Sequence, residues 1–90
     1  MSKRKFGYKP IETFIEFREL GTSPSGKTKI WEVVNTNNGG EDSCGFVRWH
    51  GPWRKYVFQS PDDSFFDWDF LRYVGDFIET QTLRHREAKR

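Results

Sequence analysis

The 90-residue sequence has a single cysteine, Cys44, and no apolar run near the ~18 residues that a membrane-spanning helix needs. One cysteine excludes an internal disulfide and any metal site made of cysteines alone. The first residues are basic, but no apolar stretch of signal-peptide length follows them. From these absences we expect a protein of a reducing cytoplasm, without membrane association.

Aromatic residues are abundant by contrast. The chain has nine Phe, four Trp and three Tyr, which is about half of a hydrophobic set that makes up 34% of the residues. A domain of this size is only marginally stabilised by its core, and each aromatic side chain can bury ~150–250 Å². With 31% charged residues, the composition indicates one small folded domain rather than a disordered chain.

The net charge of +2 conceals separate clusters of each sign. Residues 1–10 carry four basic and no acidic side chains, and we interpret them as a basic arm before a single domain at 11–90. Residues 62–79 carry six acidic side chains against one basic, and residues 84–90 are basic again. Basic ends are typically solvated, although they can also help to hold a polyanion.

Three stretches rich in β-branched and aromatic residues predict strands. Residues 11–20 and 27–36 are separated by turn residues at 21–26. Residues 45–59 carry two aromatic-rich runs around Gly51-Pro52, which predicts a hairpin, because glycine adopts the positive φ of tight turns and proline is excluded from the ladder.

A two-residue loop at Gly51-Pro52 would place Arg48 opposite Lys55. Alternation then predicts one face with Val47, Trp49, Arg54, Tyr56 and Phe58, and another with Phe46, Arg48, His50, Trp53, Lys55 and Val57. We expect Trp49 and Tyr56 to belong to the core. A slip of one residue would exchange the faces of one strand, so the register is the weak point of this prediction.

Residues 67–86 predict a helix. Asp67 is the expected N-cap, or Ser64 if the helix starts earlier. Gly75 in the middle costs about 1 kcal/mol relative to Ala, and we expect a sheet aromatic to pack closely against it. The residues that follow a spacing of 3.6 are Leu71, Val74, Phe77, Ile78 and Thr82, with Phe70 at the edge of the stripe.

These segments predict an α+β fold, in which a mainly antiparallel meander of four strands carries one C-terminal helix across one face. Phe65 and Phe66 could add a short edge strand. One helix covers only one side of the sheet, and antiparallel sheets tolerate an open second face. We expect the functional surface on that open face.

The order KTKIWEVVN, GFVRWHGPWRKYVF, SFFDWDFLRYVGDFI resembles a group of small proteins encoded by bacteriophages and prophages. The resemblance spans residues 27–80 and implies a phage origin and action in a bacterial cytoplasm; it implies no ligand and no activity. The matching positions are Trp31, Glu32, Val33, Gly45, Trp49, Trp53, Arg54, Tyr56, Phe58, Phe66, Leu71, Phe77 and Ile78.

Catalytic arrangements are not indicated. A hydrolase would need Cys44 or a serine beside His50 or His85, but we expect His85 in an exposed tail, and no spacing puts a nucleophile beside an oriented base. The acidic pairs at 62–63 and 67–69 lack the Gly and Glu of a calcium loop, and neither a P-loop nor GxGxxG occurs. We therefore predict a protein that is not an enzyme and has no cofactor or metal.

The remaining candidate is the basic and aromatic hairpin. Like charges opposite one another, Arg48 and Lys55, destabilise a ladder, and a bound anion would relieve the repulsion. Arginine binds phosphate through a planar fork, and bases stack on exposed tryptophan. We therefore predict a site for an anionic, nucleotide-type ligand. Its residues are Arg48, His50, Trp53, Arg54 and Lys55.

Three versions of this function stay open. In the first, a small nucleotide is bound, for instance at a homo-oligomer interface, and a phage protein would thereby sequester a host signal. In the second, a single nucleic-acid strand crosses the open sheet face, although a net charge of +2 is low for that role. In the third, the face binds a host or phage protein mainly through Phe46, Trp53 and Val57.

Overall fold

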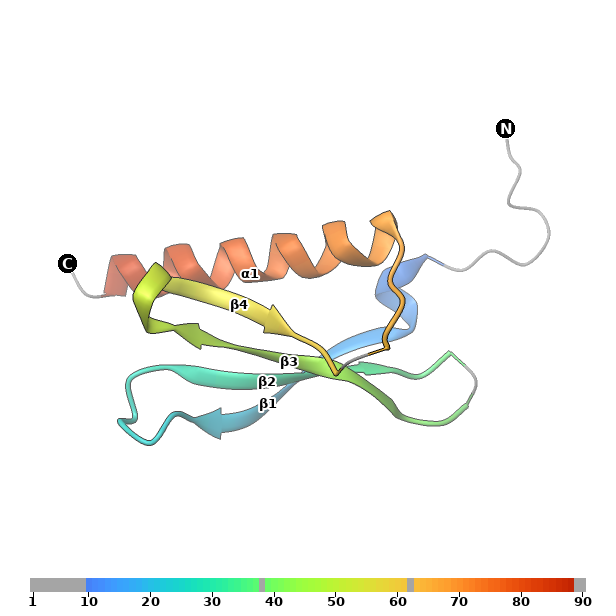
Figure 1. Ribbon diagram of the computed structural model, residues 1–90, viewed down its shortest axis with the longest axis horizontal. Helices are drawn as coiled ribbons and strands as arrows, with labels where there is room; N and C mark the ends of the chain where they lie inside the picture. Colours follow the sequence, from blue (N-terminus) through green and yellow to red (C-terminus); the bar gives the residue numbers. More distant parts are fainter. Residues whose placement is uncertain (1–9, 38, 62, 89–90) are drawn as a thin grey trace.

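The computed structural model describes residues 10–37, 39–61 and 63–88. Apart from its last residue, the predicted basic arm lies outside these ranges. The described residues form an antiparallel sheet with strand order β1-β2-β3-β4 and a long helix along one face (Figure 1). The predicted α+β meander with a C-terminal helix is confirmed.

The elements match the predicted segments closely. The strands are β1 (Ile15–Thr22), β2 (Lys29–Asn35), β3 (Asp42–His50) and β4 (Lys55–Gln59), and the helix is α1 (Trp68–Ala88). Two short 3-10 turns are η2 (Ile11–Thr13) and η3 (Gly51–Trp53). The strand nearest to α1 is β4, which runs alongside the helix (Figure 1).

Two predicted strand segments are wrong. Residues 11–13 form η2, because the carbonyl of Pro10 accepts hydrogen bonds from the main-chain N–H and the hydroxyl of Thr13, at 3.0 and 2.6 Å. This turn directs Ile11 into the core. Residues 65–66 form no edge strand. Instead the Phe66 ring stacks on Phe70, with centroids 4.4 Å apart.

The N-cap of α1 is Asp67, as predicted. Its Oδ1 accepts the main-chain N–H of Phe70 at 2.9 Å, which satisfies one of the four donors left free at a helix start. The helix therefore begins at Trp68, and this start fixes which residues face the sheet.

The buried stripe of α1 is rotated from the predicted one. Phe70 is buried, whereas Leu71 is 52% exposed, and the buried residues Val74 and Thr82 follow at helical spacing. Phe70 rather than Leu71 is buried because the Phe70 ring packs on Phe66 and Phe58. Gly75 faces outward, and a Cβ added there would meet nothing within 4 Å. The predicted close contact of Gly75 with a sheet aromatic is therefore wrong.

The core lies between α1 and the sheet. Its buried members are Ile11, Ile15, Trp31, Val33, Val47, Tyr56, Phe70 and Val74. Phe77 is half-buried; its ring stacks on Phe17 at 3.9 Å and meets Trp31 edge-on at 5.0 Å. Tyr56 is thus in the core as predicted, and Trp49 is half-buried against it.

Gly45 in β3 lets the main chain at the end of β4 approach β3 more closely than a residue with a side chain would allow. Its φ is +144°, and an added Cβ would overlap the main-chain oxygen of Gln59 at the end of β4. The Phe58 ring also covers this position. Gly45 therefore lets β4 close over β3 before the chain turns toward α1.

The hairpin loop is longer than predicted. The turn comprises residues 51–54, because Arg54 adopts a left-handed conformation (φ 57°, ψ 47°) and its N–H closes on the carbonyl of His50 at 2.9 Å. The register shifts by two residues, to Arg48 opposite Val57 and His50 opposite Lys55. Because a two-residue shift preserves alternation, the strand residues keep their predicted faces.

The described residues contain no helix with the length and hydropathy of a membrane span.

Candidate functional site

The five predicted ligand residues are distributed over two sides of the hairpin. Arg48, His50 and Lys55 alternate with the core-facing Trp49 and Tyr56, so they lie on the face turned away from α1. Arg48 and Lys55 are diagonal neighbours rather than a direct pair. The predicted direct opposition of like charges is therefore wrong, and the argument for an anion at that point is lost.

Trp53 is at the tip of the hairpin. It is 65% exposed, and its ring meets His50 edge-on with centroids 4.6 Å apart. Arg48 lies over the ring of Phe46, 6.0 Å from its centroid. The open face thus carries separate basic and aromatic contacts. Two pockets of the described residues have no lining residue among Phe46, Arg48, His50 and Trp53.

Arg54, a member of the predicted set, lines a pocket. The pocket lies where the hairpin turn, the β1–β2 turn and the end of α1 meet, and its volume is about 570 Å³, within the range of small-molecule sites. We call it the basic pocket. Its lining residues are Ser23, Ser25, Lys27, Thr28, Trp49, Gly51, Arg54, His85 and Arg86.

The lining of the basic pocket is cationic. It has two arginines, a lysine and a histidine, and none of its lining residues is a carboxylate. Arg86 donates a hydrogen bond from Nη2 to the main-chain carbonyl of Arg54 at 2.9 Å. This bond ties the Arg86 guanidinium to the main chain of the hairpin turn and leaves its remaining N–H groups for other acceptors.

An aromatic wall closes one side of the basic pocket. The rings of Trp49 and His85 are 4.5 Å apart, and Trp49 meets Tyr56 edge-on at 5.2 Å. His85 is therefore half-buried against the sheet and is not in an exposed tail as predicted.

Two hydrogen bonds from the core hold the three segments of the basic pocket in place. The buried Thr82 hydroxyl accepts the main-chain N–H of Tyr56 at 3.0 Å and so joins α1 to β4. The Tyr56 hydroxyl accepts the main-chain N–H of Lys29 at 3.1 Å and so joins β4 to the start of β2. The pocket is thus built on fixed elements.

The β1–β2 turn supplies hydroxyl groups to the basic pocket. Ser23 donates its main-chain N–H to the carbonyl of Thr28 at 2.8 Å, and its hydroxyl lies 3.1 Å from that of Ser25. The predicted site did not include these segments, because residues 21–26 were predicted only to form a turn and residues 84–86 only to end a helix. The available signal was that both segments carry anion-binding side chains, but nothing in the sequence places them together.

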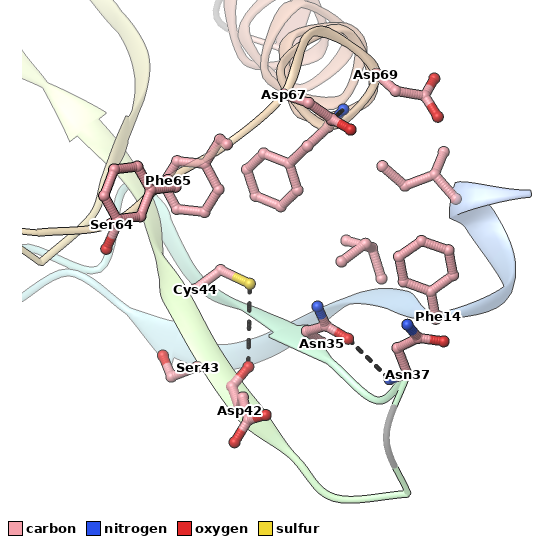
Figure 2. A pocket seen from close by; sticks show the side chains of 14 residues that line it. Phe14, Asn35, Asn37, Asp42, Ser43, Cys44, Ser64, Phe65, Asp67 and Asp69 are labelled. Atoms are coloured by element: carbon pink, nitrogen blue, oxygen red, sulfur yellow. Dashed lines mark hydrogen bonds between the residues drawn. The ribbon is translucent and has the colours of Figure 1, made fainter.

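A second pocket, of about 880 Å³, lies at the opposite end of the molecule, around the start of α1. We call it the acidic pocket. Its lining residues are Ile11, Phe14, Ile15, Asn35, Asn37, Asp42, Ser43, Cys44, Ser64, Phe65, Phe66, Asp67, Asp69 and Phe70. Figure 2 shows Asp67 and Asp69 at the helix end, across the hollow from Asp42 and Asn37.

The Cys44 thiol points into the acidic pocket (Figure 2) and contacts the carbonyl of Asp42 at 4.0 Å. Burial, and to a smaller extent the Asp42 carboxylate, raises the pKa of this thiol above its usual range, which is the opposite of what an activated nucleophile needs. Within the described ranges, no group of three or more acidic, His or Cys side chains is arranged to hold a metal.

Comparison with models of protein families, with curated proteins and with solved structures found no match for this chain.

Proposed function

We propose that this protein is a non-enzymatic binding protein for a small anionic ligand of nucleotide type, and that the ligand occupies the basic pocket. The observation that carries the proposal is a pocket lined by Lys27, Arg54 and Arg86 and by no carboxylate, in which the Arg86 guanidinium is tied to the hairpin turn. Planar arginine groups bind phosphate through two N–H donors each. Lys27 and the serine hydroxyls add donors of the same kind.

The conformation of Arg54 supports the same proposal. Its φ of 57° is one that glycine adopts at far lower energy, and a non-glycine residue there costs about 1–2 kcal/mol. A strained position at a residue that lines a pocket is consistent with a binding role. Trp49 and His85 offer the flat surfaces that a base would contact.

The open sheet face is less suited to a nucleic-acid strand. There Arg18 is engaged by two carboxylates, Glu16 at 2.8 Å and Glu41 at 2.9 Å. Charges of both signs do not form the continuous basic track that single-strand binding uses. A ligand of bounded size in the basic pocket is therefore favoured, and binding without turnover suits a protein that sequesters a nucleotide signal.

A thermal-shift titration with mono-, di- and cyclic nucleotides tests the proposal. A ligand at about 100 times its Kd stabilises by about 2.7 kcal/mol, which is a rise in Tm of roughly 10–20 °C for a domain of this size. The double variant Arg54→Gln/Arg86→Gln should lose this shift. The matched control, Arg48→Gln/Lys55→Gln, removes the same charge from the other face of the hairpin and should keep it.

Two results would overturn the proposal. If the control variant alone loses the shift, the ligand lies on the open face of the hairpin. If no anionic nucleotide raises the Tm of the wild-type protein at millimolar concentration, a nucleotide-type ligand is excluded.

A further inference from the structure

The acidic pocket is an apolar hollow with a negative rim and, among its lining residues, no basic side chain. Its floor is made of aromatic and aliphatic side chains, including Ile11, Phe14 and Phe70. At its edge Phe65 is 95% exposed. Phe65 therefore extends the apolar lining to an exposed edge, and an exposed apolar surface with a polar rim is typical of interaction sites.

The charge of the rim defines which kind of segment the acidic pocket would bind. Three carboxylates, those of Asp42, Asp67 and Asp69, belong to the lining. The fitting occupant is a short segment that has several Lys or Arg side chains for the rim and one or two aromatic side chains for the floor.

Residues 1–9 of this chain have that composition. They read Met-Ser-Lys-Arg-Lys-Phe-Gly-Tyr-Lys, with four basic residues, two aromatic residues and no acidic residue. They are joined through Pro10 to Ile11, which itself lines the acidic pocket. Nine residues reach up to about 30 Å, so the pocket lies well within their range.

We propose that the basic arm, residues 1–9, binds in the acidic pocket of its own chain, with its cations on the aspartate rim and Phe6 or Tyr8 on the apolar floor. Attachment raises the effective concentration of the arm to the order of 1 mM. A modest affinity of about 0.1 mM for the free segment would then keep roughly nine-tenths of the pockets filled. This site is independent of the basic pocket.

Cys44 provides the measurement, because its thiol points into the acidic pocket (Figure 2) and it is the only cysteine of the chain. The rate of its alkylation by the neutral reagent iodoacetamide reports access to the pocket. The rate is measured at about pH 8, where the arm lysines keep their charge. It is divided by the thiolate fraction of each variant at that pH, because a nearby cation also changes this fraction.

The test compares variants of the full-length protein with wild type at low salt. Replacing the four arm cations with Gln (Lys3→Gln, Arg4→Gln, Lys5→Gln and Lys9→Gln) should raise this corrected rate about tenfold over wild type, given the occupancy above. The control replaces four cations elsewhere (Lys29, Arg48, Lys55 and Arg84 to Gln) and should react as wild type does. Phe65→Ala should also speed the reaction, since it removes an apolar contact from the edge.

Two additions identify the occupant. A synthetic peptide of residues 1–9, added to the arm-neutralised protein, should slow alkylation again, and about 1 M salt should remove the protection of wild type. The proposal is overturned if wild type and the arm-neutralised protein react equally fast at low salt. It is also overturned if dilution of the wild-type protein speeds the alkylation of Cys44, because the pocket is then occupied by a second copy of the chain rather than by the chain's own arm.

Discussion

The Nη2 atom of Arg86, in the last turn of α1, donates a hydrogen bond to the main-chain carbonyl of Arg54 in the β3–β4 turn at 2.9 Å. The bond links a helix end to a turn 32 residues away in the sequence. It also joins two residues that line the basic pocket.

Two substitutions of Arg54 are expected to change the free energy of unfolding and the affinity for a nucleotide in different ways. Arg54→Gly relieves the left-handed strain and should raise the free energy of unfolding by about 0.5–1 kcal/mol, while it weakens nucleotide binding, since a charged hydrogen bond is worth about 1.5–3 kcal/mol. Arg54→Gln should weaken binding without the stabilisation, because it keeps the strained φ. Urea unfolding and the nucleotide titration measure the two quantities. A destabilised Arg54→Gly would mean that the guanidinium holds the fold together.

The faces of the hairpin were predictable from the sequence, whereas its register was not. Alternation along a strand is local, so Trp49 and Tyr56 are assigned to the core with either loop length. The loop length depends on the positive φ of Arg54, which residue preference assigns to glycine or asparagine. The shift of the β3–β4 register by two residues follows from the left-handed conformation of Arg54.

The basic pocket was only partly predictable for a different reason. Arg54 was in the predicted site, but Lys27 and Arg86 come from segments that only the tertiary fold brings together. The length of the hairpin loop and the rotation of α1 about its axis decide where they meet. The rotation of α1 depends on packing of Phe70 against Phe66 and Phe58, which no periodicity in the helix alone specifies.

The hydroxyl of Thr82 is predicted to be a structural contact. Thr82→Val keeps the shape of the side chain but leaves the buried N–H of Tyr56 without its acceptor, which should cost about 1–3 kcal/mol. Thr80→Val, at an exposed position of the same helix, should change stability by less than about 0.5 kcal/mol. Chemical unfolding of both variants is the measurement. Equal stabilities would show that the Thr82 bond contributes nothing.

Gly75→Ala should stabilise the protein. The position is exposed, its added Cβ meets nothing within 4 Å, and Ala exceeds Gly in helix propensity by about 0.8–1 kcal/mol. We expect Tm to rise by roughly 3–8 °C, measured by circular dichroism at 222 nm. A fall in Tm would indicate that this face of α1 is covered in solution, for instance by a second copy of the chain.

Gly45→Ala should have the opposite effect, although the change in composition is identical. The new Cβ would overlap the main-chain oxygen of Gln59, and the φ of +144° is one that alanine rarely adopts. Neither can be relieved by a side-chain rotation, because the obstructing atom belongs to the backbone of β4. Main-chain strain and overpacking each cost about 1–3 kcal/mol, a large part of the stability of a small domain. We therefore expect Gly45→Ala to lower Tm by at least about 8 °C and to loosen the end of β4, which amide exchange would detect as faster exchange there than in β2. If Gly45→Ala has the same Tm as wild type, the main chain of Gln59 does not approach Gly45 this closely. The path of the chain from β4 into α1 would then have to differ.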